Sequence, residues 1–167
     1  TMSKEFCFKH GATGPMLRGS GVSWDLRKER PYGIYEDLDF NVIVGEGIKG
    51  QVGACWDRYY VRMQEMHESL KIIKQCLEGI EEGPIMGKVS KVLKVPEGEI
   101  YMRTECPRGE LGYHLISDGT KTPYRLKVKS SCFTHVGMLP EIAQGQMIAD
   151  FVATIGSIDI VLGEVDR

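Results

Sequence analysis

Carboxylates near the carboxyl terminus are the side chains whose type and spacing could support chemistry. The last segment alternates apolar residues with three carboxylates and ends on a cation, in the order Asp159, Glu164, Asp166 and Arg167. Asp159 stands between two isoleucines, so burial would raise the pKa of its carboxyl group and let it exchange protons near neutral pH. The alternative, which we slightly favour, is a carboxylate that pairs with Arg167 or Arg108 and fixes the tail.

The cysteines offer little redox or metal chemistry. They are odd in number, widely spaced and nowhere arranged as Cys-x-x-Cys. This pattern argues against a disulfide scaffold and against a zinc or iron–sulfur site built from this chain alone. Scattered thiols are typical of a reducing compartment, where most of them pack as small apolar side chains. The five are Cys7, Cys55, Cys76, Cys106 and Cys132.

Residues 10–21 are rich in glycine and include Pro15. This composition argues against a regular helix and allows the backbone to approach another group closely. The Gly-x-x-x-x-Gly-Lys-Ser/Thr pattern of a phosphate-binding loop is absent. We therefore favour tight packing over ligand contact for this segment.

Composition bounds the possible classes of protein. The chain has 167 residues, 42% apolar and 26% charged, with a net charge of −2, which suits one domain with a single core. The balanced charge argues against a nucleic-acid partner, and no apolar stretch reaches the roughly 20 residues that cross a bilayer. We predict an α+β fold, one incomplete domain overall. Its parts are a glycine-rich, irregular segment (1–50), a long helix and linker (51–98), a small antiparallel sheet (99–135) and a final helix with a buried tail (136–167).

The clearest periodic pattern lies in residues 51–80. Apolar residues recur there at alternating steps of three and four, which predicts a long helix with a seam buried in a bundle. Charged residues occupy the opposite face, which we expect to be solvated. The seam comprises Trp56, Tyr59, Met63, Met66, Leu70, Ile73, Leu77 and Ile80.

From residue 99 the apolar period changes to two, which predicts three short strands near Ile100, Tyr113 and Tyr124. One face of this sheet should be apolar and the other basic. The basic face is either solvated or a docking surface for a partner or anionic headgroups, and both interpretations stay open. Its cations include Arg125, Lys127 and Lys129.

Two further elements are predicted on weaker patterns. A short strand is expected at Phe40–Val44. The last helix should begin near Leu139, continue through Gly145 and bury an apolar stripe. That stripe comprises Ile148, Phe151, Val152 and Ile155.

Three stretches together closely resemble the 49-kDa-type (D) component of respiratory complex I, the NADH–quinone oxidoreductase, and its related plastid counterpart. They are residues 11–21, Pro107–Gly112 and Gly156–Arg167, with Tyr59–Arg62 and Tyr124–Lys127 between them. The resemblance runs across essentially the whole chain but matches only the C-terminal part of the family, well under half of its usual length. It implies part of a fold like that of the large subunit of nickel–iron hydrogenases.

The resemblance implies a peripheral-arm subunit, or a split part of one, in a proton-pumping enzyme. The enzyme would lie on the matrix side of the mitochondrial inner membrane or on the cytoplasmic face of a bacterial plasma membrane. Quinone would be the substrate, this chain would bind no cofactor, and the terminal iron–sulfur cluster would lie in a neighbouring subunit. A second chain would supply the missing N-terminal half, which in the family carries the His and Tyr thought to hold the quinone headgroup. The isolated chain is expected to be inactive, and the alternative is a structural docking subunit without contact to quinone.

The hydrogenase relatives make the carboxyl terminus the place to look for the site. Their Asp-Pro-Cys-x-x-Cys motif holds the metals, and the aligned residues here are Asp159, Ile160, Val161 and Glu164. Because an aliphatic group and a carboxylate replace the soft thiolates, a nickel–iron centre cannot be held. The resemblance makes Asp159 a candidate for proton delivery and Val161 a candidate for the pocket wall.

Three arginines complete the candidate site. Arg108 resembles the arginine of a Pro-Arg-Gly element that points into the ancestral cavity, and Arg167 closes the tail. Arg18 would brace the same region, with Glu164 in a supporting role, although a structural ion pair is the favoured interpretation for Arg18.

Overall fold

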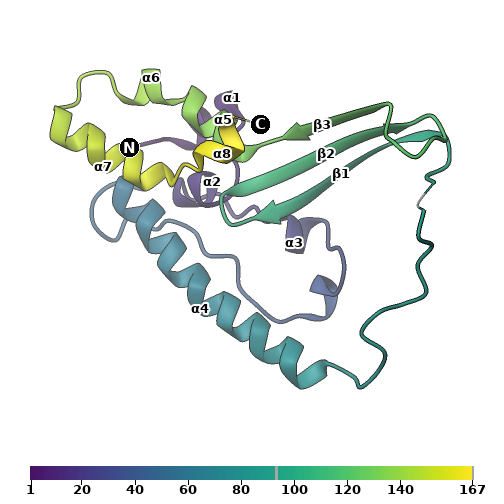
Figure 1. Ribbon diagram of the computed structural model, residues 1–167. Coiled ribbons are helices and arrows are strands. Elements are labelled where there is room, and N and C mark those ends of the chain that lie inside the picture. The colour runs from purple at the N-terminus through teal and green to yellow at the C-terminus, as the bar shows by residue number, and fades with distance from the viewer. Residues whose placement is uncertain (93, 167) are drawn as a thin grey trace.

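The computed structural model describes residues 1–92 and 94–166. Short helices form a central body, from which one long helix and a three-stranded sheet extend in different directions (Figure 1). This arrangement confirms the predicted α+β class. The elements are α1 (Lys4–His10), α2 (Pro15–Gly19), α3 (Leu26–Glu29), the 3-10 turn η1 (Tyr35–Asp37), α4 (Cys55–Gly79), β1 (Gly98–Cys106), β2 (Gly109–Ser117), β3 (Arg125–Lys129), α5 (Ser131–Gly137), α6 (Leu139–Ile142), α7 (Ile148–Ile158) and α8 (Leu162–Val165).

The glycine-rich segment folds into the end of α1 and the whole of α2. The Oγ atom of Ser3 caps α1, Gly11 ends it at a φ of 67°, and Pro15 opens α2 at a position where proline is favoured. The expectation that this segment contains no helix is therefore wrong. The tight packing is real, because a Cβ atom on Gly14 would collide with the backbone of Gly109.

The core lies where the first and last parts of the chain meet. Apolar side chains of α1, α2 and α7 pack together there with Met138, which joins α5 to α6. Burial of this cluster provides the main apolar stabilisation of the body. Its members are Met2, Cys7, Ala12, Met16, Leu17, Met138 and Ile158.

Helix α4 is present where the periodicity predicts it, but its faces are reversed. Its buried residues come from the charged side, whereas Leu77 on the apolar seam is 70% exposed. The charged side finds its partners within this chain, in α2 and α7, and the seam is left largely uncovered. The predicted solvation of the charged face is therefore wrong here. The buried residues of α4 are Asp57, Arg58, Val61 and Glu68.

The sheet confirms the prediction of three antiparallel strands in the order β1-β2-β3. Tyr101, His114 and Lys127 are cross-strand partners and share one face, while Ile100, Leu115 and Leu126 share the other. The sheet therefore has the predicted basic and apolar faces. Its β1–β2 turn reaches back into the helical body, as Figure 1 shows.

The strand predicted at residues 40–44 is absent. The segment is not paired with another strand, and two donors in and directly after it are taken by other groups. The N–H of Asn41 donates to the Glu68 carboxylate at 2.9 Å, and the N–H of Gly45 donates to the Arg18 carbonyl at 2.8 Å. These two donors are therefore not available for a strand ladder.

The predicted last helix is broken into α6 and α7. Gly145 lies between them at a φ of 73°, in the left-handed region that glycine adopts without a steric penalty. In α7 the buried residues are Thr154 and Ile158, and most of the predicted apolar stripe faces outward, with Ile148 and Val152 exposed. The expected burial of that stripe is therefore wrong.

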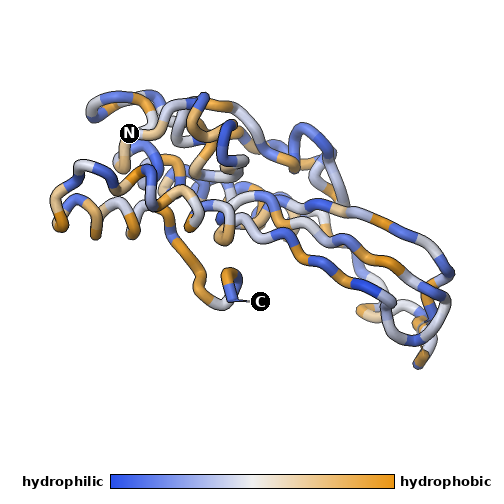
Figure 2. The backbone as a smooth tube through the Cα atoms, turned by 90° about the horizontal axis from the view of Figure 1, so that it is seen from above, coloured by the Kyte–Doolittle hydropathy of each residue, from blue (hydrophilic) through white to orange (hydrophobic). Residues whose placement is uncertain are grey.

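The tail is not buried as predicted. Ile158 is fully buried, but the largely apolar segment that follows runs out from the body (Figure 2), and Leu162 is 72% exposed. The physical reason is that α8 packs against α5 through the anchored carboxylate of Glu164 and gains little apolar cover from this chain.

Candidate functional site

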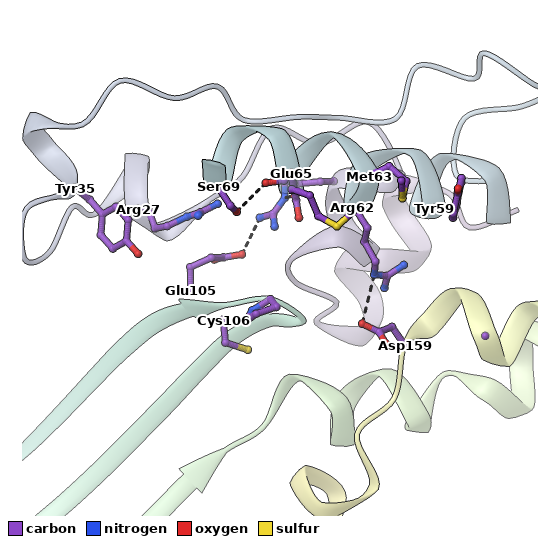
Figure 3. Close-up of a pocket in the computed structure, with 14 residues that line it drawn as sticks. Arg27, Tyr35, Tyr59, Arg62, Met63, Glu65, Ser69, Glu105, Cys106 and Asp159 are labelled. Atoms are coloured by element: carbon purple, nitrogen blue, oxygen red, sulfur yellow. Dashed lines mark hydrogen bonds and ion pairs between the residues drawn. The ribbon is translucent and has the colours of Figure 1, made fainter. Parts of the chain in front are cut away.

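A cavity of about 690 Å³ lies between α4, the end of β1 and the end of α7 (Figure 3). Tyr59, Met63 and Met66 of the α4 seam, with Tyr35, supply aromatic and thioether surface to its wall. Charged side chains gather into two groups on the same wall. An apolar slot with a few convergent polar groups is the usual form of a small-molecule site.

The first group is centred on Arg18 of α2, which is almost fully buried. Its Nε atom donates to Glu65 at 2.6 Å, and its Nη1 atom donates to Glu105 at 2.8 Å. Burial lowers the pKa of Arg18, but the nearby carboxylates raise it by more, so the net shift is upward. Arg18 therefore stays charged and joins α2 to α4 and β1.

Asp25, the cap of α3, completes this first group. Its carboxylate accepts two hydrogen bonds from the Arg27 side chain, at 2.9 and 2.6 Å, and lies 3.6 Å from Arg18 Nη1. Burial alone would raise the pKa of Asp25, but the hydrogen bonds from Arg27 hold it below its usual range. Asp25 is therefore ionised, and Arg27 is its main partner.

The second group is centred on Asp159, which follows α7 directly. Arg108 Nε donates to the Asp159 carbonyl at 3.1 Å, and Arg108 Nη2 lies 3.5 Å from its carboxylate. Arg62 of α4 approaches the same carboxylate at 3.8 Å and donates to the carbonyls of Ser157 and Ile158 at 2.7 and 3.1 Å. Two arginines thus hold the end of α7 against α4 and the β-hairpin.

Asp159 adopts a left-handed backbone conformation, with a φ of 57°. It is the only residue other than glycine with a positive φ among residues 1–92 and 94–166. Asp tolerates this region better than most residues, and the two arginines stabilise it there. Its side chain is 44% exposed toward the cavity, so the burial on which the proton-exchange argument depended is not met in this chain.

The structure brings together only some of the residues singled out from the sequence. Arg18 and Asp159 both line the cavity. Arg108 is not among the lining residues but donates a hydrogen bond to the Asp159 carbonyl. The contact between Asp159 and Arg108 matches the interpretation in which this carboxylate pairs with an arginine and fixes the tail. Val161 lies outside the cavity wall and is exposed, and Arg167 falls outside the described residues.

Glu164 holds α8 against the start of α5. Its carboxylate accepts hydrogen bonds from the Ser130 hydroxyl at 2.6 Å and from the Cys132 N–H and thiol at 3.3 and 3.1 Å. Burial raises the pKa of Glu164, but these donors lower it below its usual range. In this structure Glu164 anchors the tail rather than lining the cavity.

Sequence reasoning missed Arg62, Glu65 and Glu105, although all three line the cavity. A signal was present for the two on α4. Arg58, Arg62, Glu65 and Glu68 follow one another at steps of three and four, a second stripe beside the apolar seam. Glu105 gave no such signal, because a carboxylate at an alternate position of a strand normally faces solvent.

His135 of α5 is buried, lies within the electrostatic reach of Arg62, and was not singled out either. Its Nε2 atom accepts a hydrogen bond from the Thr13 N–H at 3.4 Å, which leaves the proton of the neutral ring on Nδ1. Burial, reinforced by the positive charge of Arg62, lowers the pKa of His135 to about 4. The ring is therefore neutral at physiological pH.

Two kinds of feature are absent among the described residues. In the part of the chain that the structure describes, no three His, Cys, Asp or Glu side chains are grouped to hold a metal ion. Within the same residues, no helix has both the length and the apolar character needed to cross a bilayer.

Sequence comparisons identify relatives across the whole chain. A D-type component of NADH-quinone oxidoreductase from Solibacter usitatus is 49% identical over 166 residues, covering 99% of this chain and 44% of the relative. The corresponding proteins of Chlorobaculum tepidum and Anaplasma marginale are 51% identical over 170 residues and 44% identical over 191, covering 42% and 47% of those relatives. The chain thus spans less than half the length of these curated relatives.

The sequence profile of a family described as "Respiratory-chain NADH dehydrogenase, 49 Kd subunit" matches residues 1–93 and 88–167, which together span the chain. Combined with relatives that align from end to end of this sequence, the match leaves one assignment. The chain belongs to the 49-kDa subunit family of respiratory-chain NADH dehydrogenase.

Proposed function

We propose that this chain forms part of the 49-kDa-type subunit of a proton-pumping NADH–quinone oxidoreductase and lines part of its quinone-reduction pocket. The terminal iron–sulfur cluster of a neighbouring subunit would supply electrons, and the pocket would face that subunit. The observation that carries this proposal is the cavity itself, where aromatic and thioether side chains meet the Asp159 group. Reduction of a quinone needs an apolar slot for the ring and polar groups that supply protons, and this wall has both.

In this proposal the residues of the Asp159 group have distinct tasks. The Asp159 carboxylate faces the cavity and would exchange a proton with a bound quinone from an exposed position rather than a buried one. Arg62 and Arg108 act as positioning residues, since they hold the backbone and carboxylate of Asp159. Val161, two residues further on, would reach the pocket wall once the rest of the assembly covers the tail.

The first test is Asp159→Asn in the assembled enzyme. Asn tolerates the left-handed backbone conformation and keeps the shape of the side chain, so the change removes mainly the charge. We expect quinone reduction to fall by about tenfold or more, with an altered pH profile. Asp118→Asn, in an exposed turn, is the matched control. Unchanged reduction across the pH range would remove Asp159 from proton delivery.

A second test concerns the pocket wall. Val161→Met adds bulk without charge and should narrow the slot, which would alter the response to inhibitors that compete with quinone. The matched control is the same substitution at Val95, an exposed valine that does not line the cavity. An inhibitor response equal to that of the unmodified enzyme would place Val161 away from the pocket.

One observation favours the alternative, a structural docking role without contact to quinone. The seam of α4 is exposed over most of its length, and an apolar stripe of this size requires a partner. We propose that the part of the family's fold absent from this chain covers the seam and completes a hydrogenase-like helical structure. Cross-linking in the assembled enzyme separates the two roles: contacts of Asp159 with an iron–sulfur subunit support the pocket, and contacts of the seam alone support docking.

The same proposal gives a location. As part of this enzyme the chain would sit peripherally on an energy-transducing membrane, associated with the other subunits of the complex. Membrane fractions washed with high salt should retain it only while those subunits are present.

A further inference from the structure

The Arg18 group contains more carboxylates than its cations neutralise by direct contact. Asp25, Glu65 and Glu105 all lie within ion-pair distance of Arg18, and Arg27 is the one further cation that contacts any of them in the described residues. Three acids therefore share two guanidinium groups. Figure 3 shows Arg27, Glu65 and Glu105 drawn together on one side of the cavity.

The distances show how the charges are divided. Arg27 binds Asp25 through two hydrogen bonds, so this pair is internally neutral. Arg18 is then left between Glu65, at 2.6 Å from Nε, and Glu105, at 2.8 Å from Nη1. One positive charge faces two carboxyl groups.

Burial decides which carboxyl group carries a proton. The side chain of Glu105 is 4% exposed, whereas that of Glu65 is 18% exposed and also lies in the field of Arg62. A surplus negative charge away from water is costly, so the deeper acid gains more from binding a proton. In agreement with this division, burial raises the pKa of Glu105 even though Arg18 lowers it.

We propose that Glu105 holds a proton at neutral pH and donates it to the acceptor that occupies the cavity. The acceptor is a quinone if the proposed function is correct, and in that respect this inference rests on it. No motif in the sequence points to Glu105, and the group is distinct from Asp159, which lies at the other end of the cavity wall.

The proton transfer is balanced within the site. The O–H bond of Glu105 breaks, and its proton forms a new bond to the acceptor. The electron pair of the broken bond stays on the carboxylate. The carboxylate left behind accepts hydrogen bonds from Arg18 Nη1 and from the Leu26 N–H at 3.3 Å, which stabilise its new charge. Reprotonation of this carboxylate from water would complete the cycle.

The charged and titratable groups that face Glu105 come from four elements or their flanks. They are Arg18 of α2, Asp25 and Arg27 at α3, Glu65 of α4, and the Tyr32 hydroxyl before η1, which accepts a hydrogen bond from the Glu105 N–H at 3.0 Å. Of these, only Arg18 donates to the Glu105 carboxylate through its side chain.

The decisive experiment compares Glu105→Gln with Glu99→Gln in the assembled enzyme. Both residues lie on β1, but Glu99 is exposed and pairs with His114. An amide resembles a neutral carboxyl group, so Glu105→Gln should assemble normally. Infrared titration should show a protonated carboxyl band at neutral pH in the unmodified enzyme and in Glu99→Gln, and its loss in Glu105→Gln. A spectrum of Glu105→Gln that keeps this band overturns the proposal.

Donation is tested by the pH profile of quinone reduction. Loss of the donor should lower the rate by about tenfold and remove the decline at alkaline pH that deprotonation of Glu105 causes. Electron transfer from NADH to an artificial acceptor upstream of the site should be unchanged, which shows that the enzyme is intact. A profile of Glu105→Gln that matches the unmodified enzyme, while Asp159→Asn is impaired, overturns donation by Glu105.

The same data distinguish this inference from the proposed function. If the carboxyl band disappears in Glu105→Gln but neither this variant nor Asp159→Asn affects quinone reduction, the stored proton is real and the cavity is not the quinone site. If the band persists, Glu105 is ionised and this inference fails, whatever Asp159→Asn does.

Discussion

The two faces of α4 differ in polarity and in what this chain does with them. The inward face carries Asp57, Arg58 and Glu68 and is buried, whereas the outward face carries the apolar seam and is exposed. In an ordinary single domain the polarity would be the reverse. The comparison teaches that helical periodicity identifies a helix, while the face that is covered depends on which partners lie in the same chain.

The inward face is stable because each charge meets a specific partner. Asp57 accepts the N–H groups of Gly47 and Gly53, each at 3.0 Å, and Arg58 donates to the Gly53 carbonyl at 2.8 Å. Buried polar groups of this kind are tolerated only when they are paired. Removal of one partner should therefore cost more than removal of an apolar side chain from the outward face.

The largest effect is expected for Arg18→Ala, which removes the partner of Glu65 on the inward face. It leaves the half-buried Glu65 carboxylate without its guanidinium partner and opens a gap at a buried position, so it should lower the free energy of unfolding by about 3–5 kcal/mol. Urea titration of the assembled protein, followed by proteolysis of the unfolded fraction, measures this. Arg125→Ala on the exposed face of the sheet is the control, and equal losses in the two variants would contradict the comparison.

The next effect concerns pH, because burial, reinforced by Arg62 of the inward face, lowers the pKa of His135. The unfolded chain binds a proton on this residue below its ordinary pKa of 6.5, whereas the folded chain binds one only below about 4. Stability should therefore fall as the pH decreases from 6.5 to 4, by about 3 kcal/mol in total, and be constant above that range. His135→Gln should flatten this dependence, while His67→Gln, on exposed α4 surface, should leave it intact.

The outward face gives the third prediction. If the remainder of the family's fold covers the seam, Leu70→Ala should destabilise the assembled protein by about 2 kcal/mol or more. Lys74→Ala, exposed on the same helix, should have almost no effect. The same urea titration compares them, and a neutral Leu70→Ala would show that the seam has no partner in the assembly.

The smallest effect is expected where α2 meets the inward face. A Cβ atom on Gly19 would lie 2.8 Å from Arg58 Cγ, so Gly19→Ala forces that side chain to move, at a cost of about 1–2 kcal/mol. Gly79→Ala, at the open end of α4, meets no atom within 4 Å and should be neutral or slightly stabilising. A stabilising Gly19→Ala would show that this contact is loose.

The elements that could be predicted from the sequence are those fixed by local periodicity. The 3-and-4 spacing located α4, and strict alternation located β1 and β3, because both patterns arise within a few consecutive residues. Gly145 shows where this reasoning fails. A glycine inside a helix costs only about 1 kcal/mol, but the left-handed conformation that Gly145 adopts separates α6 from α7.

The site could be predicted only in part, because its groups join distant segments. The resemblance in the tail directed attention to Asp159, and that residue does line the cavity. Arg62 and Glu105 lie on different elements, and no spacing along the sequence relates them. The charged stripe of α4 is visible in the sequence, but its burial depends on α2 and α7, which pack against it only after folding.

The contact between Gly14 and Gly109 has a consequence for the order of events during synthesis. It joins α2 to the β1–β2 turn, which leaves the ribosome only after the whole of α4 and the following linker. The Thr13 hydroxyl, which accepts the Glu110 N–H at 2.9 Å, belongs to the same junction. The first two helices must therefore wait, with Met16 and Leu17 uncovered, until the hairpin and the helices after it have emerged. Closure over so long a separation is slow, and nascent chains of this protein should depend on chaperones during that interval.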